Sequence, residues 1–289
     1  MDFERMNDRT LNEAAEFIAR QQARPESHIA YFGVTAAEIL SGIADFQPPN
    51  NVLLARDSGR LIGLIGADTE EETRRAWIHG PCVDYNDWHS VADALYVAAH
   101  QHGVIPAFVT GTELLGVREN TRLAEFAARH GFAPVRAANS LRFPREAAPG
   151  LPIVEMPDLA NDQETAFMTL HGALFPKTYY SSAQLLEKRD EFHRILVAEQ
   201  DGRLVGYIFA QMRAGDGDGY IDFLGVEEAA RRQGHGKRLI AAATRWLFSF
   251  SNVREVLLTV FDDDLPAMAL YTGLGFEHRQ SLTGYRKNW

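Results

Sequence analysis

The chain has 289 residues, and its 39 acidic residues outnumber its 29 basic residues, which gives a formal charge of −10 at pH 7. This charge argues against general nucleic-acid binding, because a phosphate backbone requires a basic protein surface. It favours cationic partners mildly, or simply keeps the protein soluble. No apolar run of about 18 residues predicts a membrane span. The single cysteine and the charged start, Met1–Arg5, favour a cytoplasmic protein without a secretory signal.

The first half is expected to alternate helices and strands. The Asp57-Ser58-Gly59 step lies between two apolar runs and predicts a hairpin turn. Periodicity predicts helices at Asp8–Gln22, Thr35–Phe46, Val91–Gln101 and Thr121–His130. Strands are expected at Val52–Ala55, Leu61–Ala67, Ala76–Val83, Ala107–Gly111 and Asn139–Phe143.

The second half repeats the first. Leu54–Ala67 matches Val197–Ala210 at an offset of 143 residues, and Gly131-Phe132 matches Gly275-Phe276 at an offset of 144. This constant register indicates a tandem duplication. We expect a first domain at residues 1–145 and a second at 151–289. Between them Pro144–Gly150 lacks periodicity and carries two prolines, as a linker would.

The second copy is expected to contain a short strand at Ile153–Glu155 and helices at Asp162–Leu174 and Ser182–Lys188. Asp201-Gly202 predicts a second hairpin turn. Further strands are expected at Tyr220–Val226 and Val256–Val260, with a helix between them. As in the first copy, a helix and a last strand are expected to follow.

The most informative stretch is Arg231-Arg232-Gln233-Gly234-His235-Gly236, which joins the strand at Tyr220–Val226 to that helix. The first amides of a helix lack internal acceptors and attract anions. The two glycines permit close approach of a ligand, and Arg231, Arg232 and Lys237 add positive charge. A phosphate or pyrophosphate is the natural ligand.

Two well-known phosphate loops do not fit. A nucleotide P-loop requires Ser or Thr after Gly-Lys, but Gly236-Lys237 is followed by Arg238. The dinucleotide fingerprint requires a third glycine where Leu239 stands.

The chain resembles the GNAT N-acetyltransferase superfamily, whose acyl-CoA loop reads Arg/Gln-x-x-Gly-x-Gly/Ala. Val226 stands five residues before Arg231, Ala267–Tyr271 resembles the family's A-x-x-L-Y helix, and Leu274-Gly275-Phe276 resembles its closing L-G-F. The resemblance covers nearly the whole chain, strongly from Arg194 to Phe276 and weakly in the first half.

The resemblance implies an α/β fold of two tandem copies, each with a central mixed, mostly antiparallel sheet flanked by helices. It implies transfer of an acetyl group from acetyl-CoA, as cosubstrate, to a primary amine of a small molecule or peptide. The protein would be a monomer with an internal pseudo-dimer, or a homodimer. The alternative is a non-catalytic acyl-CoA-binding regulatory module, or a structural partner without a ligand. The implied cofactor contacts are Leu224, Gly225, Val226, Arg231, Arg232, Gln233, Gly234, His235, Gly236 and Lys237.

Tyr271 and Asp222 are the catalytic candidates. A phenol with a reference pKa of about 10 is protonated at neutral pH and can donate to the departing sulfur; otherwise Tyr271 packs against the sheet. Asp222, on the strand before the loop, would have a raised pKa among apolar neighbours and would accept an amine proton. Otherwise it forms an ion pair or is a hydrogen-bonding strand residue. Glu227 and Glu228 are nearby alternatives for the base, but their positions are typical of a solvated turn. Gly225 permits close approach of a ligand or forms a bulge.

The first copy lacks these groups. Counting from Val83 puts Trp88, Val91 and Asp93 where the second copy has Arg231, Gly234 and Gly236, and Ala127 where it has Tyr271. We therefore predict that the first copy is a structural or acceptor-shaping domain. Asn120 stands where the family has an asparagine, whereas the second copy has Asp264, which we interpret as a helix N-cap.

The remaining candidates are weaker. By resemblance, Phe175–Tyr180 and the helices on either side of it form the acceptor side of the cleft; otherwise this aromatic segment caps the core. No histidine has the spacing of a metal site, His100-Gln101-His102 being the nearest, so no metal is expected. Cys82 is expected to be a buried strand residue rather than a nucleophile.

Overall fold

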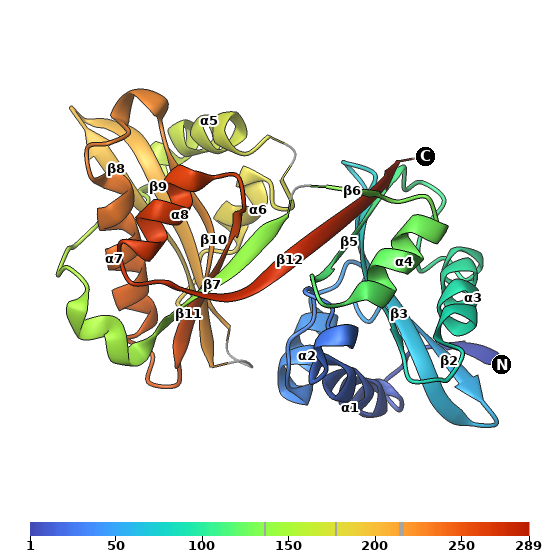
Figure 1. Cartoon of the computed structure of the whole chain (residues 1–289). Coiled ribbons are helices and arrows are strands. Elements are labelled where there is room, and N and C mark those ends of the chain that lie inside the picture. The colour runs from blue at the N-terminus through green and yellow to red at the C-terminus, as the bar shows by residue number, and fades with distance from the viewer. Residues whose placement is uncertain (136, 177, 214–216, 289) are drawn as a thin grey trace. The chain divides into compact units, whose positions relative to one another are not determined.

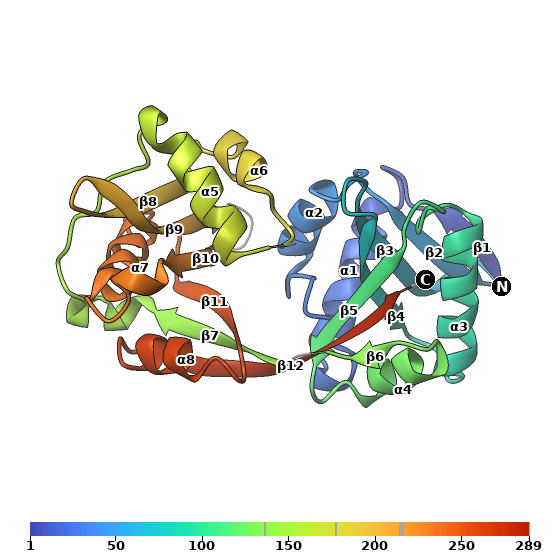
Figure 2. The ribbon, with the colours of Figure 1, turned by 90° about the horizontal axis from the view of Figure 1, so that it is seen from above.

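The computed structural model describes residues 1–135, 137–176, 178–213 and 217–288 (Figure 1). The chain forms two compact units. Unit 1 contains Met1–Ala138 and Ser281–Trp289, and unit 2 contains Asn139–Gln280. Each unit has a mixed, mostly antiparallel sheet with helices on both faces, which confirms the predicted fold class (Figures 1 and 2).

The sheet of unit 1 has the strand order β1-β2-β3-β4-β5-β12. Among the described strands of unit 1, β4 and β5 pair in parallel and the other pairs are antiparallel. Ser58 and Gly59 have φ values of 50° and 81°, so the expected turn joins β2 to β3 with the left-handed backbone that hairpins favour. The strands are β1 (Asp2–Arg5), β2 (Val52–Asp57), β3 (Arg60–Glu70), β4 (Arg75–Val83), β5 (Gly111–Val117) and the end of β12 (Glu277–Asn288), with β6 (Ala133–Pro134) also paired to β12.

The helices of unit 1 cover both faces of this sheet (Figure 2). α1 (Leu11–Gln22) and α2 (Ala36–Ala44) pack together, and α3 (Trp88–Gln101) packs on β2, β3 and β4 beside α4 (Thr121–Arg129). Thr35 and Glu38 form a capping box that starts α2. The apolar faces of α1 and α3 meet the inner strands in one continuous core.

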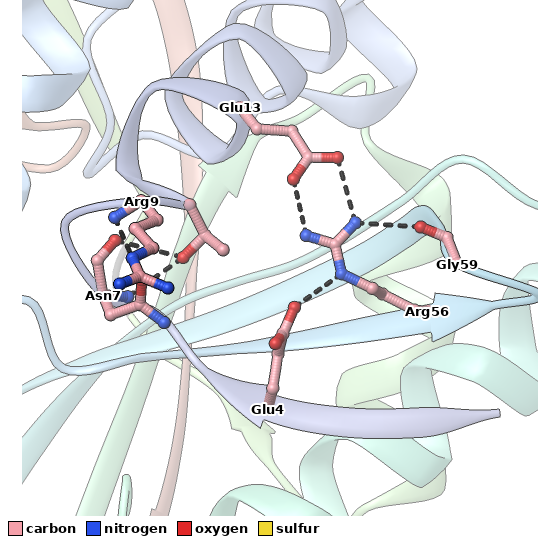
Figure 3. A network of polar contacts seen from close by, with 7 residues as sticks. Glu4, Asn7, Arg9, Glu13, Arg56 and Gly59 are labelled. Atoms are coloured by element: carbon pink, nitrogen blue, oxygen red, sulfur yellow. Dashed lines mark hydrogen bonds and ion pairs between the residues drawn. The ribbon is translucent and has the colours of Figure 1, made fainter.

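Arg56 fastens the edge of the sheet in unit 1 (Figure 3). Its guanidinium donates to Glu4 on β1 at 2.5 Å, to both carboxylate oxygens of Glu13 on α1 at 3.0 and 2.5 Å, and to the Gly59 carbonyl at 3.2 Å. The hydrogen bond from Arg56 lowers the pKa of Glu13. One side chain thus joins β1, β2 and α1.

Unit 2 repeats this arrangement. Its strand order is β7-β11-β10-β9-β8, with the start of β12 beside β7, and β10 and β11 pair in parallel. Asp201 and Gly202, at φ 52° and 73°, form the second expected hairpin turn. The strands are β7 (Ala138–Pro144), β8 (His193–Gln200), β9 (Arg203–Arg213), β10 (Asp218–Val226) and β11 (Glu255–Phe261).

Helices flank both faces of this second sheet (Figure 1). α5 (Glu164–Leu174) and α6 (Ser182–Glu187) lie on one face, and α7 (His235–Leu247) and α8 (Leu265–Thr272) lie on the other. Ser181 and Gln184 form the capping box of α6. The predicted helices and most predicted strands are therefore confirmed.

Some predicted elements differ. Ala107–Thr110 is not a strand; β5 begins at Gly111 and runs to Val117. Ile153–Glu155 is also not a strand, because Pro157–Leu159 instead bridges the edge strand β8 further along. The sequence did not predict β1, whereas β12 is the closing strand that was expected after the last helix of the second copy.

The compact units also differ from the boundaries expected from the repeat. The last strand of each repeat joins the sheet of the other unit: β7 belongs to unit 2, and residues 281 onward of β12 belong to unit 1. The expected linker lies inside unit 2, where Arg145–Gly150 forms the short helix η2. Each unit thus includes the final strand of the other repeat.

Candidate active site

The candidate site of unit 2 begins where two parallel strands separate. β10 pairs with β11 only over Asp218–Ile221 with Glu255–Leu258, although the strands run on to Val226 and Phe261. On its other side β10 stays paired with β9 as far as Val226. Among the described residues, no strand pairs with Leu224–Val226 on the side of β11, so a ligand can reach their backbone groups there.

The predicted loop lies just beyond this opening. The short helix η4 (Glu228–Ala230) follows β10, and α7 then starts with Gly234 as its N-cap at φ 87°. No side chain caps α7. Within the described chain, the amides of His235, Gly236 and Lys237 have no acceptor, so they can bind an anion together.

The charge around these amides is positive. Arg231, Arg232, Lys237 and Arg238 are exposed at the start of α7. Nε of Arg231 donates to the Val226 carbonyl at 3.0 Å, which fixes this side chain between the end of β10 and the helix. The start of α7 is thus a basic region that attracts a negatively charged ligand, although the chain as a whole is acidic.

The two loop glycines serve different purposes. A Cβ on Gly234 would meet nothing within 4 Å, so its positive φ is the reason for glycine there. A Cβ on Gly236 would lie 3.2 Å from Leu270 of α8 and 4.0 Å from Leu224 of β10. Gly236 therefore lets the start of α7, Leu270 of α8 and the end of β10 come together.

Gly225 has a structural explanation. A Cβ at this position would lie 2.6 Å from Leu174 and 3.0 Å from Phe175. The absent side chain thus accommodates the end of α5. This packing accounts for Gly225 without a ligand, whereas the alternative of a bulge at Gly225 is wrong, because the irregularity in β10 falls between Ile221 and Phe223.

Tyr271 lies on α8 next to Leu270 and is only 8% exposed. Its ring packs edge-on against Phe276 at 5.8 Å, and its hydroxyl has no hydrogen-bond partner among the described residues. Burial, with the charge of Asp264, raises the pKa of Tyr271 above its usual value of 10. Asp264 accepts from the Ala267 amide at 3.1 Å, so it is the predicted N-cap of α8.

Asp222 occupies the irregular position in β10, one residue after the pairing with β11 ends. Its carboxylate accepts from the Tyr179 hydroxyl at 3.0 Å and from Nε2 of Gln211 at 2.8 Å. The expectation of an apolar environment is therefore wrong, because polar groups from β9 and from the segment before α6 surround it. Sequence reasoning missed the pairing of Asp222 with Gln211.

Aromatic rings pack beside Tyr179, which donates to this carboxylate. Tyr179 stacks on Phe223 at 5.0 Å, and Phe175 packs edge-on against Phe223 at 5.1 Å. Burial of its hydroxyl, with the Asp222 charge, holds the pKa of Tyr179 well above its usual range, although 42% of the whole residue is exposed. Lys177, in the middle of this predicted acceptor segment, lies outside the described residues.

His171 of α5 anchors the same segment. It is 3% exposed, and Nε2 lies 3.0 Å from the Tyr180 carbonyl while Nδ1 lies 2.6 Å from the Tyr207 hydroxyl. Burial lowers the pKa of His171, so the ring is neutral. Because a carbonyl only accepts, Nε2 carries the proton and Tyr207 donates to Nδ1.

We expect His171→Leu to destabilise unit 2 by about 2 to 4 kcal/mol, because it removes the buried hydrogen bonds that His171 makes with the Tyr207 hydroxyl and the Tyr180 carbonyl. Hydrogen exchange of unit 2 peptides under mild denaturant measures this loss. Since the folded pKa lies below the unfolded value of 6.5, the contribution of His171 is present above pH 6.5 and declines as the pH falls below it.

His171→Gln is the matched control, because its amide can still donate but does not titrate. Its stability should change less between pH 5 and 7 than that of the wild type. Equal pH slopes for the two proteins would show that His171 is not the titrating group.

Unit 1 has a different helix start at the equivalent place. The N-cap of α3 is Asp87, whose side chain accepts from the Ser90 amide at 3.2 Å. This carboxylate takes the place that an anion would need and would repel it. Ala127, at the position of Tyr271, is buried on α4, and Asn120 caps that helix as Asp264 caps α8.

The predicted residue correspondence in this loop needs correction. Asp87 stands four residues after Val83, whereas Gly234 stands eight after Val226. The loop of unit 1 is therefore shorter, so Val91 and Asp93 lie within α3 rather than at its start. The conclusion that the first copy lacks the loop is unaffected.

Other candidates contribute no site. Cys82 is buried on β4, and burial raises the pKa of its thiol to about 12. In the part of the chain that the structure describes, no cluster of three His, Cys, Asp or Glu side chains can hold a metal, and no helix is long and apolar enough to cross a membrane.

One pocket of unit 2, of about 440 Å³, lies at the start of β8, and no predicted site residue lines it. Within its lining, Arg194 pairs with Asp158 at 3.5 Å and His193 lies 2.7 Å from Asp190.

Comparison with known proteins agrees with this geometry. Residues 156–276, which carry β10, the loop, α7 and α8, match the sequence model described as the acetyltransferase (GNAT) family. They form a GNAT acetyltransferase domain. The resemblance inferred from the loop and from the A-x-x-L-Y helix is thereby confirmed.

Two curated proteins illustrate the relatives of this GNAT domain. A mycothiol acetyltransferase from Thermomonospora curvata is 29% identical over 168 residues, which cover 53% of this chain and 56% of that protein. An N-alpha-acetyltransferase from Sulfurisphaera tokodaii is 33% identical over 99 residues, which cover 31% of this chain and 59% of that protein. The matches thus span little more than half of each relative.

The similarity to solved structures of GNAT proteins covers nearly the whole chain. A GCN5-related N-acetyltransferase from Sphaerobacter thermophilus superposes with a TM-score of 0.76 at 18% identity, covering 99% of this chain and 95% of that chain. A tandem GNAT protein from the clavulanic acid biosynthesis pathway gives 0.73 at 16% identity, covering 99% and 98%. At these identities the agreement concerns the fold, and it confirms two tandem copies.

Proposed function

We propose that unit 2 binds acetyl-CoA and transfers its acetyl group to a primary amine of a small molecule or peptide by direct attack in a ternary complex. The start of α7 carries the proposal. Three free amides, a glycine N-cap and exposed basic side chains form an anion site beside the open edge of β10. The pyrophosphate would bind at the amides of His235, Gly236 and Lys237, with Arg231, Arg232 and Gln233 around it.

The rest of the cofactor would follow the opening between β10 and β11. Its pantetheine arm is extended and carries amide groups, so it can hydrogen-bond the backbone of Leu224–Val226 as an added strand does. This orients the thioester toward Asp222 and Tyr271. Holding both reactants in position can contribute about 7 to 11 kcal/mol to lowering the barrier.

Chemistry then requires attack of a neutral amine on the thioester carbonyl, formation of the C–N bond and loss of the C–S bond. Asp222 would take a proton from the amine, directly or through water. Its two donors, Tyr179 and Gln211, stabilise the ionised form, which is the form that accepts a proton.

Tyr271 would act on the departing sulfur. Its raised pKa keeps the hydroxyl protonated at neutral pH. A thiol has a reference pKa of about 8.5, so complete proton transfer from this phenol is uphill. The hydroxyl would therefore stabilise the developing thiolate mainly as a hydrogen-bond donor.

Release of free CoA thiol from acetyl-CoA, measured over a panel of small-molecule and peptide amines, tests this function. Amine-dependent release is the expected result. Tight CoA binding without release for any amine would favour a non-catalytic acyl-CoA-binding module instead.

Gly234→Asp should abolish most CoA binding, with at least about a hundredfold loss of affinity by calorimetry. The new carboxylate would cap α7 as Asp87 caps α3, taking up the free amides and repelling the pyrophosphate. The wild type should show one CoA site per chain.

Gly234→Asn is the matched control for this variant. Asparagine has the same size and tolerates the left-handed backbone, but it carries no charge. Its affinity should lie between those of the wild type and Gly234→Asp. Wild-type affinity in Gly234→Asp would place the pyrophosphate elsewhere.

A further inference from the structure

The two units share a gap between parallel strands. In unit 1, β4 pairs with β5 over Arg75–Ile78 with Gly111–Leu114, and the strands then run on to Val83 and Val117. In unit 2, β10 and β11 separate in the same way after Ile221 and Leu258. Backbone groups at such an edge need partners, from protein, water or a ligand.

In unit 1 the chain itself supplies those partners. Ile29 forms an antiparallel bridge with Gly116, and the Ala30 amide donates to the Leu115 carbonyl at 3.0 Å. β12 occupies the other side of β5 along its whole length, from Val117 to Gly111. Residues 28–30 must therefore lie on the β4 side, within the gap.

Gln22 of α1 holds this segment in place. Its Nε2 donates to the carbonyls of Ile29, Phe32 and Gly33 at 2.8, 3.1 and 3.2 Å, and its Oε1 accepts from the Ile29 amide at 2.7 Å. Gln22 is 4% exposed and Ile29 is 1% exposed. Water therefore does not compete for these hydrogen bonds, which are made in a buried place.

The far end of the segment is fixed as well. Nδ2 of Asn120, the N-cap of α4, donates to the His28 carbonyl at 3.2 Å. Gly116 brings Leu123 close, since a Cβ there would lie 2.5 Å from that side chain and 3.3 Å from the His28 carbonyl. The segment thus fills a fitted slot rather than crossing the surface.

We infer that residues 28–30 are a built-in substitute for a ligand arm, so that the first copy is permanently closed. The equivalent gap in unit 2 has no such segment among the described residues, because no part of the described chain bridges β11 beyond Leu258 on the β10 side. An extended amide-bearing ligand would complete unit 2, whereas unit 1 is complete without one. Two features then exclude acyl-CoA from unit 1: the filled slot and the Asp87 cap.

Hydrogen exchange of the full chain tests the inference, with Gln22→Met as the variant. Methionine keeps the length of the side chain and removes its hydrogen bonds. Amide exchange in residues 27–33 and 115–117 should become at least about tenfold faster relative to β3 of the same protein.

Gln21→Met is the matched control, because Gln21 is the neighbouring buried glutamine, 1% exposed, and its Nε2 has no partner in the described chain. It should leave exchange in residues 27–33 unchanged. Equal acceleration in the two variants would overturn the inference. If Gln22→Met unfolds unit 1, Gln22→Glu, which keeps the acceptor for the Ile29 amide, replaces it.

A second measurement adds CoA to the wild-type chain. Exchange in residues 27–33 and 111–117 should not change, while exchange in residues 222–240 should slow. Slowing in residues 111–117, or faster exchange in residues 27–33, would show a ligand entering the gap of unit 1 and would overturn the inference.

Discussion

Tyr271→Phe should lower kcat for amine acetylation by about 10² to 10⁴ while leaving CoA affinity nearly unchanged. The substitution removes only the hydroxyl, which has no partner in the described chain, and keeps the ring that packs on Phe276. The departing thiolate would then lose its donor. Single-turnover kinetics at saturating acetyl-CoA and amine measure the effect on the chemical step.

The pH profile adds a control for this assignment. Because the pKa of Tyr271 is raised above 10, its ionisation should not reduce kcat of the wild type below about pH 10. A kcat of Tyr271→Phe within about threefold of wild type, with chemistry rate-limiting, would refute the role. A packing tyrosine would instead change the free energy of unfolding and leave kcat per folded molecule intact.

Deleting the chain from Ser281 onward should unfold unit 1, although that unit is otherwise formed by residues 1–138. The deletion removes a strand that pairs with β5 from Leu282 to Asn288 and takes away the buried Leu282. At about 1 kcal/mol for each backbone hydrogen bond, the loss is on the order of 5 kcal/mol. That is comparable to the whole stability of many domains.

Hydrogen exchange measures the two units separately. Peptides from β2 and β3 should lose protection in the truncated chain, and peptides from β8 and β9 should keep theirs. Deletion of Met1–Arg5 is the control. It removes the short edge strand β1 and Glu4, which accepts from Arg56, and it should reduce the stability of unit 1 by less. Equal loss of protection in both units would mean that they unfold together.

Local chemistry explains what the sequence predicted well. Gly59 and Gly202 mark their turns because the left-handed backbone there strongly favours glycine. The start of α7 could be placed from Gly234 and the apolar period that follows, and the N-cap role of Asp264 from the proline after it.

The errors concern partners that are distant in the chain. Residues 277–288 are mostly polar, so the bounds of the closing strand and its pairing with β5, from the other half of the chain, were not predicted. Asp222 was expected among apolar groups because its partners, Gln211 and Tyr179, come from other elements of the chain. Sequence periodicity does not show how those elements are placed against β10. Gly225 likewise depends on Leu174 and Phe175 of α5.

The exchanged final strands have a consequence during synthesis. Residues 1–138 of unit 1 leave the ribosome before unit 2, but the strand that completes the sheet of unit 1 is made only after unit 2. At about 5 to 20 residues per second, translation from residue 138 to residue 281 takes roughly 7 to 30 s. Throughout that interval the β12 side of β5 would be an open edge, which is the kind of surface that chaperones cover and that pairs wrongly with other nascent chains.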